Sequence, residues 1–224
     1  MVSKKAEKIL EILQTRFARP KRTIATRGAF KILIMTIISQ NTNERNTTRA
    51  FENLSNKFRV TPENLAKAEI KEIETSLKTA GLYRNKSRAI KQISEIIRKK
   101  HNGDLTHITS LPFEEARREL LQLPGVGPKT ADVVLLFAAK KPTIPVDTHV
   151  NRLSKRLGLA PKNGSYEDVR HALQRLFDPK DYLAVHMLLI QHGRRYCRAR
   201  APSCVECPFN EICPSIDLIR QRIV

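Results

Sequence analysis

Apolar residues recur at three- and four-residue spacing through almost the whole of this sequence, and that spacing constrains the fold most. Ile9 and Leu13 belong to one such stripe, and residues 30–38 are apolar nearly all round, which predicts a buried central helix. Further apolar faces run through residues 50–58 and 90–97. No run of six residues alternates cleanly between apolar and polar side chains, so we expect no sheet. The sequence therefore predicts an all-α chain of about ten helices joined by short loops.

The charge of the chain points to a polyanionic partner. There are 41 Lys and Arg residues against 22 Asp and Glu, a formal net charge of +19. This excess argues against an enzyme with a neutral surface and favours nucleic acid as the partner. A thermophilic surface rich in both signs of charge is the alternative, but it does not account for the imbalance. The longest apolar run, residues 30–39, contains Lys31 and is too short for a bilayer, and no secretory signal is visible. We expect a soluble, cytoplasmic protein with no membrane partner.

The segment LPGVGPKTA, residues 123–131, lies between two predicted helices. The first helix covers residues 114–121, and the second begins at Pro128, a residue favoured at the first helical position. Gly125 and Gly127 permit backbone angles closed to other residues and leave no side chain between the backbone and a ligand. The N–H groups of such a turn, at a helix N-terminus, suit a DNA phosphate. A plain helix–helix turn is the alternative, and the basic charge favours phosphate binding.

Two charged residues stand at predicted helix starts. Lys129 lies where the helix dipole disfavours a cation, which lowers the pKa of an amine and increases its neutral, nucleophilic fraction. A surface lysine that grips phosphate is the alternative. Asp147 fits an N-cap, and it also fits a carboxylate near Lys129 that handles protons or stabilises a developing positive charge. Both roles are compatible, and we expect His149 to be packed or hydrogen-bonded within its helix rather than catalytic.

Four cysteines fall within seventeen residues near the C-terminus: Cys197, Cys204, Cys207 and Cys213. A reducing cytosol makes a metal site more plausible there than disulfides. Four thiolates at this spacing suit either structural zinc or a [4Fe–4S] cluster, and the spacing alone does not separate the two. Arginines flank the first cysteine, among them Arg198 and Arg200, and would present a basic edge to a DNA backbone.

Taken in order, these motifs resemble the endonuclease III family. The resemblance rests on the hairpin at 123–131, on Val-Asp-Thr-His-Val at 146–150 and on the cysteine spacing. It extends upstream to Ser-Gln-Asn-Thr at 39–42 and to Ala-Gly-Leu-Tyr at 80–83, with Lys86 after it. It covers most of the chain and favours [4Fe–4S] over zinc.

The resemblance implies a helix–hairpin–helix glycosylase fold with a DNA-binding cleft between two helical lobes. One lobe would comprise residues 21–131. The other would comprise residues 1–20 and 132–224, with an iron–sulfur loop at 197–213. We expect the protein to act as a monomer.

The resemblance also implies a function: a bifunctional DNA glycosylase and AP lyase of base excision repair. Its substrate would be double-stranded DNA with an oxidised pyrimidine or an abasic site. Lys129 would attack the sugar C1′ of an extruded nucleotide and form a Schiff base, while Asp147 would stabilise the oxocarbenium-like charge. Gln40 would fill the vacated space, and Leu82 would be a second wedge. The ordinary alternatives are a capping or solvent-facing Gln40 and a Leu82 packed at a helix end.

One departure from the family pattern leaves the lesion open. Asn43, followed by Glu44, stands where an aspartate of the oxidised-pyrimidine branch is expected. A monofunctional mismatch glycosylase of the same fold is one alternative, and base release without nicking would select it. A non-catalytic iron–sulfur DNA-binding regulator is another, and cluster-dependent affinity for undamaged sequence would select it. Lys129 argues against the first alternative, and its pairing with Asp147 argues against the second.

Overall fold

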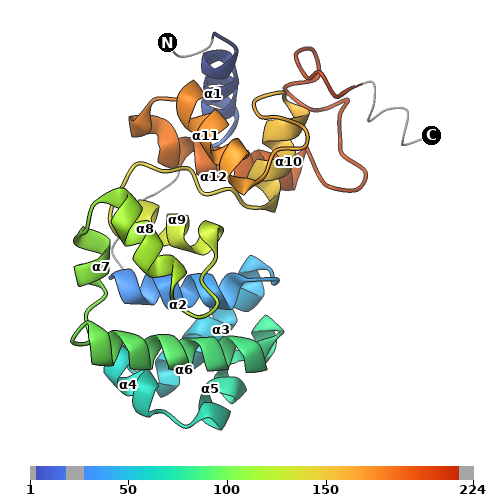
Figure 1. Cartoon of the computed structure of the whole chain (residues 1–224). Helices are drawn as coiled ribbons and strands as arrows, with labels where there is room; N and C mark the ends of the chain where they lie inside the picture. Colours follow the sequence, from blue (N-terminus) through green and yellow to red (C-terminus); the bar gives the residue numbers. More distant parts are fainter. Residues whose placement is uncertain (1–3, 19–27, 217–224) are drawn as a thin grey trace. The chain divides into compact units, whose positions relative to one another are not determined.

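The computed structural model describes residues 4–18 and 28–216. Over these two stretches the chain forms twelve α-helices and two short 3-10 helices, and no strand (Figure 1). The all-α prediction is therefore confirmed for the residues described. None of these helices is long and apolar enough to cross a membrane. The elements are, in chain order, α1 (Lys4–Arg16), α2 (Ala29–Ser39), α3 (Glu44–Lys57), α4 (Pro62–Lys67), α5 (Ile70–Leu77), η1 (Lys78–Ala80), α6 (Tyr83–Lys100), α7 (Thr106–Ser110), α8 (Phe113–Leu121), α9 (Pro128–Phe137), α10 (Thr148–Arg156), α11 (Tyr166–Leu176), η2 (Pro179–Asp181) and α12 (Tyr182–Arg195).

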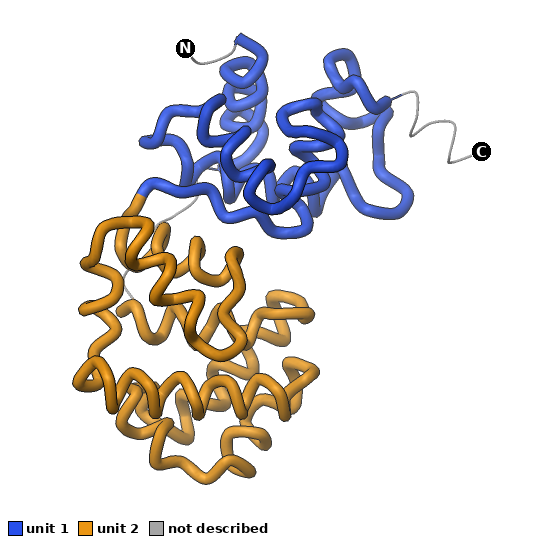
Figure 2. Tube along the Cα trace, viewed as in Figure 1, with its two compact units in different colours: residues 1–21, 142–224 blue, residues 22–141 orange. Residues whose placement is uncertain are grey.

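The helices gather into two compact units. Unit 1 comprises Met1–Lys21 and Pro142–Val224, and unit 2 comprises Arg22–Lys141 (Figure 2). The boundary expected from sequence, residue 131, falls inside α9, whereas the division follows Lys141. The reason is that α9 packs against α2 and α8, both of which belong to unit 2. That the two units act as the lobes of a DNA-binding protein stays a prediction.

Unit 2 is built around α2, the helix predicted to be buried. Seven of its 11 residues are buried, and Leu33 and Ile34 have no exposed surface. The helices α3, α6 and α9 pack against α2, and α6 also packs against α4 and α5. A helix that is apolar on nearly all sides needs such neighbours, because burying each Leu or Ile side chain contributes about 1.5–3 kcal/mol. The chain segments that leave α2 and enter α6 are therefore attached to a well-packed frame.

Unit 1 has an apolar core of its own, to which segments from both ends of the chain contribute. Ile9 and Leu13 of α1 are buried in one cluster with residues of α10, α11 and α12. Phe209, from the loop that follows α12, is fully buried in the same cluster. Three of the four cysteines pack against this cluster. The cysteine loop is thus attached to the helical core.

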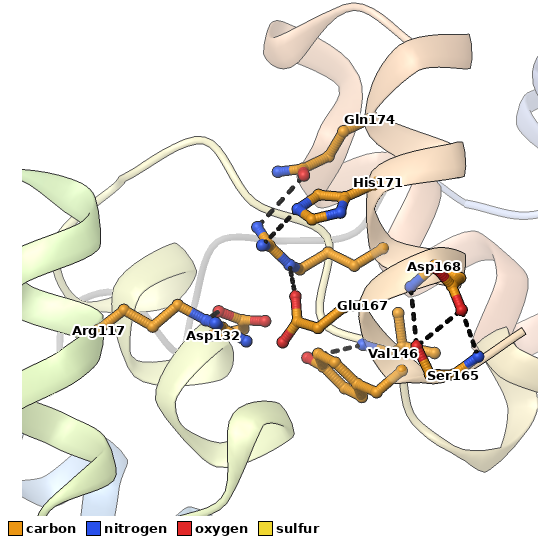
Figure 3. A network of polar contacts seen from close by, with 10 residues as sticks. Arg117, Asp132, Val146, Ser165, Glu167, Asp168, His171 and Gln174 are labelled. Atoms are coloured by element: carbon orange, nitrogen blue, oxygen red, sulfur yellow. Dashed lines mark hydrogen bonds and ion pairs between the residues drawn. The ribbon is translucent and has the colours of Figure 1, made fainter.

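Local sequence sets the ends of several helices. α4 begins where Thr61 Oγ1 accepts the N–H of Asn64 at 3.3 Å, and Pro62 takes the first helical position. α11 begins with a capping box between Ser165 and Asp168 (Figure 3). The predicted number of helices, about ten, is smaller than the number observed. The reason is that α4 and α7, of six and five residues, are too short to show an apolar period.

Candidate active site and metal centre

The turn between α8 and α9 needs glycine at one position and leaves open space at another. Gly125 has φ of +74°, and a Cβ there would lie 3.2 Å from the Cβ of Ala89. Gly127 has φ of −97°, which any residue adopts, and a Cβ there would meet nothing within 4 Å. The expectation of backbone angles closed to other residues is thus right for Gly125 and wrong for Gly127. At Gly127 the missing side chain leaves the N-terminus of α9 open to a ligand.

Lys129 is half-buried at the second position of α9, in the first turn as predicted. The helix that carries it is joined to α8 by a buried ion pair. Arg117 Nε donates to Asp132 Oδ1 at 2.8 Å, and Asp132 has no exposed surface (Figure 3). Removing one partner of such a pair costs about 3–5 kcal/mol, so the pair holds the two hairpin helices in one register. Lys129 therefore projects from a rigid support.

Gln40 reaches the hairpin from the C-terminal end of α2. Its Nε2 donates to the carbonyl of Gly125 at 2.9 Å and to Thr130 Oγ1 at 3.3 Å. Gln40 is also the C-cap residue of α2, as one alternative had it. Thr130 follows Lys129, so Gln40, the hairpin and the start of α9 gather at one end of α2. Sequence patterns give no sign of this contact, because Gln40 and Gly125 are 85 residues apart.

Leu82 is 58% exposed and precedes α6 with φ of +46°. A residue other than glycine adopts this left-handed conformation at a cost of about 1–2 kcal/mol. The alternative of a Leu82 packed at a helix end is therefore wrong. Together with Tyr83, Arg84 and Asn85 it lines a hollow in the surface. An exposed apolar side chain on a strained turn is typical of a functional contact.

Asn43, the departure from the family pattern, keeps a structural role. Its Oδ1 accepts the N–H of Asn46 at 2.9 Å and caps α3. Asparagine and aspartate are about equally good N-caps. The departure therefore removes a charge from this position while it leaves the start of α3 intact.

Asp147 is the N-cap residue of α10, as predicted, and its Oδ1 accepts the N–H of Val150 at 2.8 Å. His149, in the first turn, has its Nδ1 3.1 Å from Nη2 of Arg152. Burial lowers the pKa of the His149 imidazole, and the charge of Asp147 opposes that shift. His149 is thus hydrogen-bonded within its helix, as expected. Because Lys129 belongs to unit 2 and Asp147 to unit 1, their pairing stays a prediction.

Two arginines of α10, which sequence patterns did not single out, anchor the cysteine loop. Arg152 Nε donates to the carbonyl of Cys197 at 2.9 Å. Arg156 Nη1 donates to the Sγ of Cys197 at 3.3 Å and to the carbonyl of Arg198 at 2.9 Å. Their four-residue spacing puts both on one face of α10, and this spacing is the one feature of the sequence that could have indicated a shared partner. The helix that Asp147 caps is therefore bonded directly to the loop.

All four cysteines line a single cavity beside the helical core of unit 1. Burial raises the pKa of the Cys207 thiol to about 11; a backbone hydrogen bond from Phe209 opposes the shift, and the other three thiolates add to it. Burial also raises the pKa of Cys213. The Nε2 of His192 lies 3.5 Å from the Sγ of Cys207. The four sulfurs thus share one largely apolar environment and repel one another when ionised.

Four thiolates are a donor set that suits either structural zinc or a [4Fe–4S] cluster. Within residues 4–18 and 28–216, no three or more His, Cys, Asp or Glu side chains are grouped so as to hold one metal ion. In a [4Fe–4S] cluster each thiolate binds a different iron, so the sulfurs stay apart while the irons offset their repulsion. Four cysteines around one cavity supply the four thiolates that such a cluster takes.

The basic edge expected on the cysteine loop lies at the surface. Arg198 and Arg200 are exposed, as are Arg194 and Arg195 at the end of α12. Arg198 Nη2 donates to Ser203 Oγ at 3.1 Å, which holds the side chain along the loop. The contact of Arg198 and Arg200 with DNA stays a prediction.

Comparisons with known proteins agree with the motifs. A model of the HhH-GPD superfamily of base excision DNA repair proteins matches residues 34–179. The chain is 38% identical to endonuclease III of Thermotoga maritima over 184 residues, 82% of each chain. It is similar to a non-covalent endonuclease III–DNA complex (TM-score 0.85, 31% identity, 99% of this chain and 100% of the other). It is also similar to a trapped covalent endonuclease III–DNA intermediate (TM-score 0.84, 31% identity, 100% of both). The chain therefore belongs to the endonuclease III family, within the HhH-GPD superfamily of base excision DNA repair proteins.

Proposed function

We propose that this base excision repair glycosylase and AP lyase removes oxidised pyrimidines from double-stranded DNA, as a monomer, with Lys129 as its nucleophile. The observation that carries the proposal is the position of Lys129 in the first turn of α9, directly after the hairpin. The field at a helix N-terminus favours the neutral amine, and a neutral amine can attack a sugar carbon. An enzyme that only releases the base needs no such amine. In a prokaryotic cell we expect it to act in the cytoplasm, on the nucleoid.

The proposed chemistry has two stages. After the damaged nucleotide is extruded, Lys129 Nζ bonds to C1′ and the bond from C1′ to the base breaks, so that the base leaves with a proton. The amine loses its proton and the sugar ring opens, which gives an imine. Loss of a proton from C2′ then breaks the C3′–O bond and cuts the strand on the 3′ side. The carboxylate of Asp147 would stabilise the positive charge on the sugar and assist the proton transfers.

Several features support DNA as the substrate. The net charge of +19 attracts a phosphate backbone, and a related endonuclease III has been trapped covalently on DNA. The backbone amides of Gly125 and Gly127 would hold a phosphate near the site, where Gly127 leaves open space. Gln40 would fill the space of the extruded nucleotide, and Leu82 would enter the stack from the other strand.

We propose that the four cysteines hold a [4Fe–4S] cluster with a structural role. When bound, the cluster would neutralise the thiolates and link the two ends of residues 197–213, in addition to the contact that Phe209 makes with the core. Arg152 and Arg156 bind this loop from α10, and Arg198 and Arg200 would then face the DNA backbone from its outer edge.

Trapping with borohydride tests the proposal directly. A duplex with one oxidised pyrimidine is incubated with the protein, and base release, nicking and the reduced covalent adduct are measured separately. We expect the wild type to give all three, and Lys129→Gln to bind the duplex without forming the adduct. Lys31→Gln is the matched control, since Lys31 is an exposed lysine in the first turn of α2. Base release without an adduct in the wild type would refute the lyase assignment. Adduct formation by Lys129→Gln would refute the choice of nucleophile.

A further inference from the structure

Lys86 is a buried cation that the proposed chemistry does not use. It lies in the first turn of α6 and is only 4% exposed. Its Nζ donates to the carbonyls of Ile38 and Ala80, both at 2.8 Å. Ile38 is the penultimate residue of α2 and Ala80 is the last residue of η1. A methionine of similar length could fill this space without the cost of burying a charge, so the two carbonyl bonds are what the ammonium contributes.

The two segments that Lys86 joins are those that carry the proposed wedges. Gln40 and Leu82 each lie two residues beyond a carbonyl that Lys86 binds. Both turns are strained, since Asn41 has φ of +52° and Leu82 has φ of +46°. Backbone of this kind persists only where its surroundings hold it. The ammonium of Lys86 thus bonds the segment before Leu82 once and the end of α2 once.

A second lysine of α6 makes bonds of the same kind at a different place. Lys91 Nζ donates to the carbonyls of Ala66 and Ala68 at 3.0 and 2.8 Å, and so caps the end of α4. Neither the end of α4 nor its loop carries a residue proposed to contact DNA. Lys91 therefore shows what a lysine cap contributes when its role is structural alone.

We propose that Lys86 is a positioning residue for nucleotide extrusion, and that its ammonium holds the turns of Gln40 and Leu82 at a fixed separation so that both enter the duplex together. This inference rests on the proposed function and adds a residue to it. Two side chains from different turns can displace one nucleotide only when their positions match. Loosening one turn against the other should therefore slow extrusion more than the chemistry that follows it.

The test compares Lys86→Met with Lys91→Met on two duplexes. One duplex carries an oxidised pyrimidine beside 2-aminopurine, whose fluorescence rises when it unstacks, and the other carries an abasic site with no base to extrude. We expect Lys86→Met to slow the fluorescence rise and single-turnover base release by about tenfold. Borohydride trapping on the abasic duplex should stay close to the wild-type level. Lys91→Met should behave as wild type on both duplexes, at a temperature where every variant is folded.

Several results would overturn the inference. One is a fluorescence rise in Lys86→Met as fast as in the wild type. Another is a loss of trapping on the abasic duplex as large as the loss of base release on the damaged one. A third is an equally slow fluorescence rise in Lys91→Met. If Lys86→Met does not fold, Lys86→Gln replaces it, because the neutral amide stands on a shorter side chain that cannot reach both carbonyls. A wild-type fluorescence rise in that variant would also overturn the inference. Failure of the proposed function looks different: the wild type itself would neither release the base nor be trapped on the abasic duplex, and both proposals would fall.

Discussion

Asp147 is the N-cap of α10 and is also the proposed catalytic carboxylate, and two substitutions separate these roles. Asp147→Asn keeps an N-cap of similar quality, so the bond to the Val150 N–H, 2.8 Å in the wild type, is retained. Asp147→Ala loses that bond, at a cost of about 1 kcal/mol. For a protein of this size, 1 kcal/mol corresponds to about 2–4 °C in melting temperature. We expect a fall of about 2–4 °C for the alanine variant and less than about 1 °C for asparagine.

The rates of base release should not follow the order of the melting temperatures. Both variants remove the negative charge that is proposed to stabilise the cationic sugar. Base release should therefore fall by about a hundredfold or more in each, although only one of them is destabilised. DNA binding should be kept or slightly strengthened, because a negative charge facing a polyanion is removed.

The assay pairs thermal unfolding with single-turnover base release in one buffer. Asp168→Asn is the matched control, because Asp168 is a capping-box carboxylate of α11 with no proposed chemistry. It should release base at the wild-type rate. Wild-type base release by Asp147→Asn would show that the carboxylate is a cap alone. Equal destabilisation of the asparagine and alanine variants would refute the reasoning from the cap bond.

The hairpin, the ion pair and the cysteines give three further predictions. Gly125→Ala should lower the free energy of unfolding by about 1–2 kcal/mol, since alanine is strained at positive φ. Gly127→Ala should unfold as wild type but bind DNA more weakly in fluorescence anisotropy, and unchanged affinity would contradict an open phosphate site. Arg117→Met should cost about 3–5 kcal/mol in urea denaturation, because the charge of Asp132 stays buried, and a cost below about 1 kcal/mol would contradict this. Cys213→Ser should abolish the visible absorbance of the cluster and speed proteolysis within residues 197–213, and zinc in place of iron by elemental analysis would refute the cluster.

Much of the fold could be predicted from local patterns. The apolar residues of α2 indicate a buried helix wherever its neighbours lie, and the structure buries it. An N-cap needs only four consecutive residues, which is why Asp147 was predicted to cap α10. Gly125 marked the hairpin because a tight turn requires a residue that tolerates positive φ. Gly127 was wrongly expected to need a special backbone angle too, since the residue type alone does not show whether a glycine has positive φ or only leaves space.

Residue order by itself determined the helices and their ends, because these depend on interactions between residues a few positions apart. It also determined which chemical groups are present. Only the tertiary structure decided which groups meet. Gln40 bonds to Gly125 across 85 residues, and Lys86 bonds to Ile38 across 48. Arg152 reaches Cys197 across 45 residues. No periodicity specifies such pairs, since an amphipathic helix can present its face to many partners and the close packing of the apolar cores selects one of them.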